Sequence, residues 1–409
     1  MTYSFLIALL GWLMAFAPAT ETTVSNPQFV GATPRLTTDA VGNPLLSWVE
    51  KDGEKGTAFY FAISANDRGD GTAPAFGPKI RVKAPANIAA HAEGMPKIAV
   101  KADGTLIAIF EVPRPTSASR FAGDLLYTMS TDQGKNWTEP KPVHQDATPG
   151  KSHSFADMAR LSNGEIGVVW LDEKLPGLEG RPVVFAQTAE GKGFGPAVLV
   201  DNNACQCCRT NVFVDARKNI HLTYRDLIPA TRSGEVASRD ISTAVSTDGG
   251  KTFSKPQLVF ADHWQVNACP HAGPVVTELG NDLLMTWFSG KEDAPGLRLA
   301  RLGSEKLVAS VLTSRAKHPQ VATANGRIVW LWDESVSKDG SGEMGSFVQR
   351  IGMRTVLGKD VGSTTYLTTE TADAMYPAVL ATKRGLLIAY EQTTNSQNTL
   401  IVTRLVDTL

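Results

Sequence analysis

The sequence lacks an excess of charge of either sign: its 409 residues contain 40 Lys and Arg against 41 Asp and Glu, a formal net charge of −1. A chain without a basic excess has no general electrostatic attraction to nucleic acid or to an anionic membrane, so neither is expected as a partner. Helical periodicity is absent as well, whereas short or alternating apolar runs bounded by Gly, Asn and Asp recur throughout. These features favour an all-β protein, and no nucleotide cofactor is expected.

Long apolar runs are missing except at the N-terminus. Residues 5–16 are almost uninterruptedly apolar, and Ala17-Pro18-Ala19 follows with the small-x-small pattern of a cleavage site. The run is too short to span a bilayer comfortably. We predict a signal peptide over residues 1–19, a periplasmic or secreted protein without an integral membrane segment after cleavage, and one domain over residues 24–409. Because no Lys or Arg precedes the run, a buried first strand or a retained anchor stays open.

An internal repeat is the strongest pattern present. Each copy has an apolar stretch, a turn containing Gly or Asn, and a second apolar stretch that ends in an acidic residue in every copy but the fifth. Aligned positions in the second stretch are Trp48, Ile109, Trp170, Tyr224, Trp287, Trp332 and Tyr390. The spacing is typical of four-stranded propeller blades. It predicts an all-β propeller of seven blades, or six if one repeat is an excursion.

A second repeat marks the outer strand of each blade with a proline. Proline lacks an N–H and is tolerated at the start of an edge strand. It recurs at Pro78, Pro140, Pro196 and Pro256, and also at Asn26-Pro27, ahead of the first full repeat. The last repeat ends too early to hold its own outer strand. We therefore predict that an N-terminal strand completes the C-terminal blade and closes the ring.

Two segments match the pattern S-x-D-x-G-x-x-W/F: residues 130–137, from Ser130 to Trp137, and residues 246–253, from Ser246 to Phe253. Each lies directly before a predicted outer strand. On these motifs the chain resembles the Asp-box (BNR-repeat) sialidase-like propeller family. The resemblance covers the whole mature chain and implies a sialidase-like fold with the Asp-box turns on the face opposite the active site.

The resemblance also points to a catalytic residue. The segment from Met375-Tyr376-Pro377 to Tyr390-Glu391 is similar to the one that carries the family's catalytic Tyr, so Tyr376 is a candidate nucleophile by resemblance. The family's early Arg-Ile-Pro motif is absent, since residues 33–36 read Thr-Pro-Arg-Leu. Its arginine triad has no clear counterpart, although Arg114, Arg209 and Arg225 fall in suitable regions. These departures favour a non-sialidase member.

Sulfur and imidazole side chains gather just before the predicted first strands. In a propeller these positions lie at one mouth of the central channel, as do the acids that end the second strands. The sulfur and imidazole residues there are His91, Met95, His153, Cys205, Cys207, Cys208, Cys269, His271, His318 and Met375. The acids are Glu50, Glu111, Asp172, Asp226, Asp333 and Glu391. His144, His221 and His263 fall outside the pattern and are interpreted as structural or surface residues.

Thiolates and imidazoles are ligands for soft metal ions. Since blades four and five are neighbours, we predict a metal site formed by Cys205, Cys207, Cys208, Cys269 and His271, with His91, His153, His318, Met95 and Met375 as secondary candidates. Cys-x-Cys-Cys differs from the usual Cys-x₂-Cys zinc spacing, which favours copper, with zinc as the alternative. An exported chain with four cysteines also permits two disulfides, and a redox-active or mixed arrangement stays open.

Three functions follow from this pattern. The leading hypothesis is an exported propeller that binds copper or another soft metal ion at its channel mouth. The second is an exo-acting glycoside hydrolase of sialidase type that uses Tyr376. The third is a protein-interaction scaffold with structural disulfides.

Overall fold

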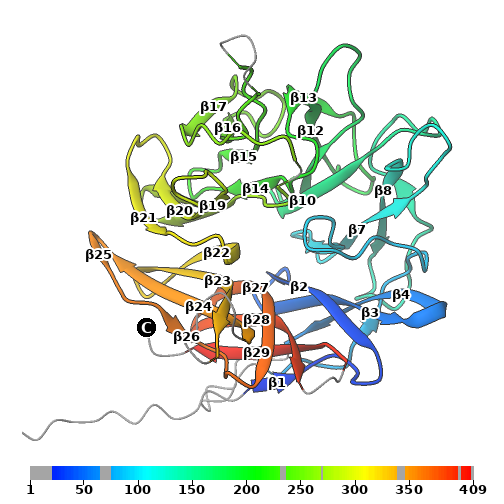
Figure 1. Ribbon diagram of the computed structural model, residues 1–409. Coiled ribbons are helices and arrows are strands. Elements are labelled where there is room, and N and C mark those ends of the chain that lie inside the picture. The colour runs from blue at the N-terminus through cyan, green and yellow to red at the C-terminus, as the bar shows by residue number, and fades with distance from the viewer. Residues whose placement is uncertain are drawn as a thin grey trace, which may run out of the picture.

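A computed structural model of the chain describes residues 21–64, 75–230, 236–268, 270–338, 346–394 and 398–406. The predicted signal peptide and Cys269 therefore lie outside the described residues. The described residues form seven antiparallel sheets that follow one another in chain order around a common centre (Figure 1). This confirms the predicted all-β, seven-bladed propeller.

Six of the sheets have four strands and the sixth in chain order has five. The first four blades are β2 (Val30–Thr38), β3 (Pro44–Asp52), β4 (Gly56–Ile63) and β5 (Ile80–Arg81); β6 (Lys97–Val100), β7 (Leu106–Pro113), β8 (Gly123–Ser130) and β9 (Lys141–Pro142); β10 (Ser154–Arg160), β11 (Ile166–Leu171), β12 (Arg181–Gln187) and β13 (Val198–Ala204); and β14 (Asn211–Val214), β15 (Ile220–Arg225), β16 (Ile241–Ser246) and β17 (Gln257–Phe260).

The last three blades complete the ring, and a short 3-10 helix, η1 (Gly53–Lys55), joins β3 to β4. These blades are β18 (Val275–Leu279), β19 (Asp282–Ser289), β20 (Gly296–Arg301) and β21 (Leu307–Val311); β22 (Ala316–Ala324), β23 (Arg327–Ser337), β24 (Phe347–Leu357), β25 (Asp360–Val361) and β26 (Thr365–Tyr366); and β27 (Ala372–Thr382), β28 (Gly385–Thr394), β29 (Leu400–Val406) and β1 (Glu21–Thr23).

The core lies between neighbouring blades. The second strand of each blade carries the aligned residue of the repeat, and all seven of these side chains are buried, with at most 1% of their surface exposed. One core cluster joins Phe59 and Phe61 of the first blade to Ile98 and Phe110 of the second. Burial against a neighbour on both sides explains why these strands read as continuous apolar runs rather than as alternating ones.

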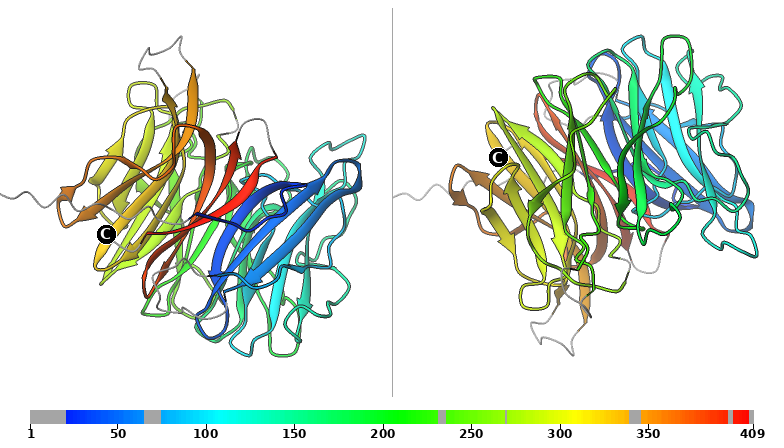
Figure 2. Two further views of the ribbon diagram at one scale, coloured as in Figure 1. Left: turned by 90° about the horizontal axis from the view of Figure 1, so that it is seen from below. Right: turned by 90° about the horizontal axis from the view of Figure 1, so that it is seen from above.

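The N-terminal strand closes the ring as predicted, but with different residues. β1 pairs with β29, with Glu21 opposite Arg404 and Thr23 opposite Val402. The Asn26-Pro27 segment, where the proline repeat placed the strand, forms a turn in which the Phe29 N–H bonds to the Asn26 carbonyl at 3.1 Å. Figure 2 shows the C-terminal strands beside the first blade.

The Asp-box turns join the third and fourth strands of their blades. The Asp132 carboxylate accepts the N–H of Asn136 at 2.8 Å, and Asp248 accepts those of Lys251 and Thr252 at 3.0 Å. Gly134 and Gly250 have φ of 85° and 87°, the left-handed region that glycine tolerates. The carboxylate therefore organises the turn, as the motif predicts.

The aromatic residue that ends each Asp box packs against the preceding blade. Trp137 contacts Phe61 edge-on, with ring centroids 6.1 Å apart, and Phe253 contacts Phe185 at 5.2 Å. Each Asp box thus fastens its own turn and also the contact between two blades. Among the described residues there is no helix of the length and apolar character needed to cross a membrane.

Candidate functional site

The predicted cysteine site lies on the loop between β13 and β14, which crosses from the third blade to the fourth. Main-chain hydrogen bonds fix this loop on both sides: the Cys205 N–H bonds to the Arg225 carbonyl at 3.0 Å, and the Thr210 N–H bonds to the Phe155 carbonyl at 3.1 Å. The Arg209 N–H bonds to the Glu93 carboxylate at 2.7 Å. The loop is therefore held by the second, third and fourth blades.

Three of the four cysteines converge on this loop. Cys205, Cys207 and Cys208 are free thiols with 0%, 5% and 1% of their surface exposed. Their sulfur atoms all lie within 4.8 Å of one another. Three buried sulfurs at that separation can share one metal ion, so the geometry permits the metal that the sequence predicts.

The surroundings of the cluster favour negative charge. Arg239 donates from Nη1 to the Cys205 sulfur at 3.1 Å. Hydrogen bonds from the Cys207 and Cys208 thiols, with Arg225 and Arg239 nearby, lower the pKa of Cys205. The bond to Cys205 raises the pKa of Cys207, and burial raises that of Cys208. Of the three thiols, Cys205 is thus the one whose surroundings favour the thiolate, and it lies beside a guanidinium.

The predicted histidine ligands are not part of this group, and Cys269 lies outside the described residues. Among the described residues, the convergent set contains the three cysteines and none of the predicted histidines. His271 is exposed. His91 is exposed too, and its ring lies 6.2 Å from that of Phe155, which packs against the cysteines. Although the residue as a whole is exposed, its ring is partly desolvated where it lies against Gly94, which lowers the pKa of the His91 imidazole; Glu93 raises that pKa, and nearby His271 lowers it further.

His153 lies in a different cluster. Its ring stacks on that of His144, with centroids 3.6 Å apart and planes 5° from parallel. His153 also forms an ion pair with Asp172, and His144 lies 3.4 Å from the Asp124 carboxylate. Sequence reasoning set His144 aside, because its position after an outer strand gave no sign of this pairing.

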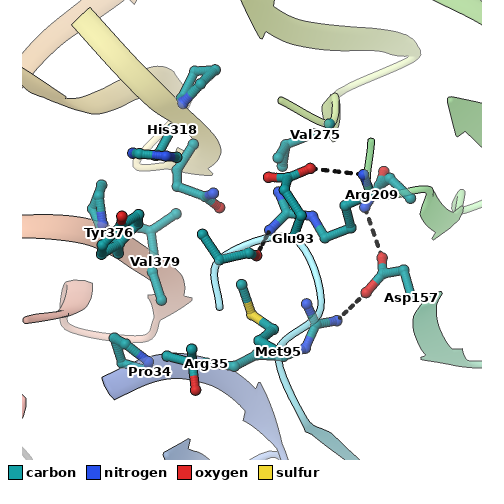
Figure 3. Close-up of a pocket in the computed structure, with 18 of the residues that line it drawn as sticks. Pro34, Arg35, Glu93, Met95, Asp157, Arg209, Val275, His318, Tyr376 and Val379 are labelled. Carbon is teal, nitrogen blue, oxygen red and sulfur yellow. Dashed lines mark hydrogen bonds and ion pairs between the residues drawn. The ribbon is translucent and has the colours of Figure 1, made fainter. Parts of the chain in front are cut away.

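A cavity of about 200 Å³ opens where the first strands of the blades meet. Figure 3 shows His318 and Tyr376 on one side of it and Glu93 and Arg209 across from them. Met95 and Arg35 lie in its wall, and Arg35 is paired with Asp157 at 2.9 Å. Because neighbouring strands are antiparallel, this mouth lies at the end of the blades opposite the Asp-box turns.

The acids that end the second strands have a repeated structural role at this mouth. Glu111 accepts the Phe155 N–H at 2.6 Å, Asp333 accepts the Tyr376 N–H at 2.7 Å, and Glu391 accepts the Thr33 N–H at 2.8 Å. In each case the acid of one blade binds a bulge in the first strand of the next, where the donating residue has φ between 54° and 59°. Three of the six predicted acids therefore hold strained backbone in place.

Tyr376 lines the cavity but lacks the partner of an activated nucleophile. Among the described residues, no hydrogen bond reaches its hydroxyl. Burial and the charges of Glu391, Asp333 and Glu93 raise its pKa. Of the three candidate arginines, only Arg209 lines the cavity, since Arg114 is exposed and pairs with Asp124. Arg225 is buried and donates to the carbonyls of Ala272 and Phe288.

One contact of the cysteine cluster involves a residue that the sequence did not single out, and one predicted acid has a partner that the sequence did not indicate. Arg239 contacts the Cys205 sulfur from the loop just before β16, a position that the repeat does not mark. Asp333 was one of the acids of the ring, but its bond to His318 Nδ1, 2.8 Å long, depends on how the first two strands of the sixth blade are paired. The secondary candidate Met375 lies on β27, opposite Glu391.

Comparison with known proteins shows the fold. No family model matches the chain, and no curated protein matches it. The solved polysaccharide lyase Uly1 is similar, with a TM-score of 0.54, 10% identity, and coverage of 98% of this chain and 94% of that one. The α-L-arabinofuranosidase Arb93A of Fusarium graminearum has a TM-score of 0.49 with 12% identity, and covers 96% and 98% of the two chains.

The NanB sialidase of Streptococcus pneumoniae has a TM-score of 0.48 with 8% identity, and covers 89% of this chain and 83% of that one. The likeness to the lyase agrees with the all-β propeller of seven blades that the strand order shows. At such low identity the likeness extends to the fold alone.

Proposed function

We propose that this chain is an exported propeller that binds one soft metal ion, copper in preference to zinc, through Cys205, Cys207 and Cys208. The observation that supports the proposal is the convergence of three buried free thiols within 4.8 Å of one another. Cys269 and His271 remain predicted further ligands. The site would serve metal handling, delivery or redox chemistry outside the cytoplasm.

The separation of the sulfurs suits a metal–thiolate centre. With metal–sulfur bonds of about 2.3 Å, the sulfurs around one ion lie roughly 3.8–4.0 Å apart, in tetrahedral or trigonal geometry. The three sulfurs are already within 4.8 Å, so binding requires only small side-chain movements. A disulfide among these three residues is less well supported than a metal site, because all three are free thiols.

The charges nearby favour a thiolate site. Three thiolates around a monovalent ion carry a net charge of −2, which is costly to bury without counter-charge. Arg239 contacts the Cys205 sulfur, and Arg225 lies close enough to lower the pKa of that thiol. Thiolates without an oxygen ligand favour soft ions, which supports copper in its cuprous state.

The test is anaerobic titration of the purified chain with Cu(I) against a chromophoric chelator, followed by metal analysis. We expect one tightly held ion per chain, and loss of that ion in the Cys205→Ser/Cys207→Ser/Cys208→Ser variant. His263→Ala is the matched control, because His263 is exposed and outside the site. Titration with Zn(II) measures the preference for copper.

Two results would contradict the proposal. One is retention of stoichiometric copper by the triple variant, which would place the ion elsewhere. The other is a wild-type chain whose four cysteines resist alkylation without reductant and which takes up no metal. Cys269→Ser and His271→Ala separately test whether those two residues complete the coordination.

A further inference from the structure

The cavity at the channel mouth contains a base that the metal proposal does not use. His318 Nδ1 lies 2.8 Å from Asp333 Oδ2, and the same oxygen accepts the Tyr376 N–H at 2.7 Å. The Asp333 side chain is 5% exposed and that of His318 is 27% exposed. A buried carboxylate that accepts Nδ1–H fixes the tautomer and leaves the lone pair on Nε2. His318 is therefore oriented as a general base that a ligand can reach.

A proton donor lies beside that base. The rings of His318 and Tyr376 are 4.4 Å apart, and Tyr376 is half-buried in the wall of the same cavity. Among the described residues nothing bonds its hydroxyl. A phenol has an ordinary pKa near 10, so it is protonated at neutral pH. Base and acid thus face the same space from β22 and β27, as Figure 3 shows.

The opposite wall of the cavity carries an arginine that could bind an anionic group. Arg209 is 9% exposed, and its side chain makes a single long hydrogen bond, 3.4 Å, to the Ala92 carbonyl. Within the described part of the chain, no carboxylate lies within ion-pair distance of its guanidinium. Arg35, by contrast, is neutralised by Asp157 at 2.9 Å. An unpaired buried cation is costly, and an anionic group on a ligand would relieve that cost.

The rest of the wall suits a sugar. Gln320 offers a side-chain amide, whereas Pro34, Pro319 and Pro377 offer flat apolar faces. Amides bond hydroxyl groups and proline rings pack on C–H faces, so the lining fits a polyhydroxylated ring rather than a simple anion.

We propose that this cavity is an acid–base site that cleaves uronate-containing polysaccharides by β-elimination. Arg209 binds the uronate carboxylate, and His318 Nε2 takes the proton from the carbon next to it. The electron pair of that C–H bond forms a carbon–carbon double bond, and the bond to the leaving glycosidic oxygen breaks. The Tyr376 O–H protonates that oxygen. The phenolate then regains a proton from the His318 imidazolium, so no further reactant is needed.

The experiment uses the full mature chain, pretreated with a metal chelator so that the result is independent of the cysteine site. The probes are polygalacturonate and a 4-linked glucuronan, and the readout is the ultraviolet absorbance of the new conjugated double bond. We expect turnover by the wild type and a fall in kcat on the order of 10²–10⁴-fold in His318→Ala and in Tyr376→Phe. Arg209→Met should chiefly raise KM.

Matched controls are His263→Ala and Tyr60→Phe, which change the same residue types away from the cavity and should leave turnover unchanged. Circular dichroism and a melting curve confirm that each variant is folded. Release of reducing ends without the absorbance change would show hydrolysis and overturn the proposal. So would full activity in His318→Ala, or a wild type that neither cleaves these polymers nor binds glucuronate or galacturonate saturably.

Discussion

The two faces of the propeller use carboxylates for the same task in opposite surroundings. On the Asp-box face, Asp132 and Asp248 accept main-chain N–H groups across exposed turns. At the channel mouth, Glu111 and Glu391 accept main-chain N–H groups of the next blade, Glu111 from a half-buried position and Glu391 from a buried one. On the Asp-box face the carboxylates stabilise turns within a blade, and at the channel mouth they stabilise contacts between neighbouring blades.

The acidities of the two sets diverge accordingly. Hydrogen bonds from Asn136 lower the pKa of Asp132 to about 2. Because water also solvates this carboxylate, little desolvation opposes the effect of those hydrogen bonds. Burial raises the pKa of Glu391 to about 7, although the Thr33 N–H opposes the rise. The same hydrogen bond therefore stabilises the charge fully only where water remains, and desolvation outweighs it at the mouth.

This difference supports placing both proposed sites at the channel mouth. The mouth holds buried groups whose charges are incompletely compensated, including Arg209 and the thiols beside Arg239. Groups of that kind are typical of functional sites, because a ligand or metal ion can supply the missing partner. The Asp-box turns have their partners already and leave nothing for a ligand to complete.

The largest effect should come from filling the close contact beneath an Asp box. A Cβ on Gly250 would lie 2.6 Å from Phe185 Cε1, whereas one on Gly249 would meet nothing within 4 Å. Both residues have positive φ. We expect Gly249→Ala to cost about 1–2 kcal/mol for the backbone conformation alone. Gly250→Ala should cost about 1–3 kcal/mol more, because Phe185 must move.

Urea unfolding of the two variants measures that difference directly, since the backbone cost is common to both. Equal losses would mean that the Asp box does not fasten the contact between blades. The comparison between the faces would then reduce to a difference in turns.

A smaller effect is expected from Glu391→Gln at the mouth. Burial raises the folded-state pKa of Glu391 to about 7, against about 4.3 in an unfolded chain. The folded state then binds more protons between these values, so wild-type stability should fall as pH rises from about 4.5 to 7. Glutamine keeps an acceptor for the Thr33 N–H and removes the charge. The variant should lose this decline, which is on the order of 3 kcal/mol.

Denaturant unfolding of wild type and variant at several pH values in that window provides the measurement. Parallel pH profiles would show that Glu391 does not carry a raised pKa, and the contrast between the faces would lose its electrostatic part.

Much of the fold could be predicted because the same blade pattern recurs seven times in the sequence. The second strand of each blade is buried on both faces and needs apolar side chains there. Trp48, Trp170 and Trp287 therefore mark the positions of their blades in the sequence. An N-terminal strand that closes the ring was predicted correctly, but its position in the sequence was not. The Asn26-Pro27 pattern that we took for an outer strand forms a turn instead. A single proline cannot distinguish those two uses of a missing N–H.

The site was less predictable, because it depends on how separate blades face one another. Adjacent spacing brought Cys205, Cys207 and Cys208 together, and the sequence shows that spacing. By contrast, His153 stacks on His144, and His318 pairs with Asp333. Those contacts follow from bulges and rotamers that no spacing encodes. Arg239 likewise reaches the sulfur from a loop that the repeat does not constrain.

The smallest effect, and the opposite sign, is expected from Asp248→Asn on the Asp-box face. Hydrogen bonds from the Thr252 hydroxyl and main chain, and from Ser246, lower the pKa of Asp248 below its ordinary value. Its stabilisation is therefore present above the unfolded pKa of about 3.9 and is lost as pH falls. The variant should be less stable than wild type at pH 7, and the two stabilities should converge in acid.

Unfolding midpoints of variant and wild type at pH 7 and below pH 3 measure this convergence, with Asp132→Asn as the equivalent change in the other Asp box. A difference that persists undiminished in acid would mean that the shape of the side chain, rather than its charge, holds the turn, and the two faces would then not differ in the sign of their response to pH.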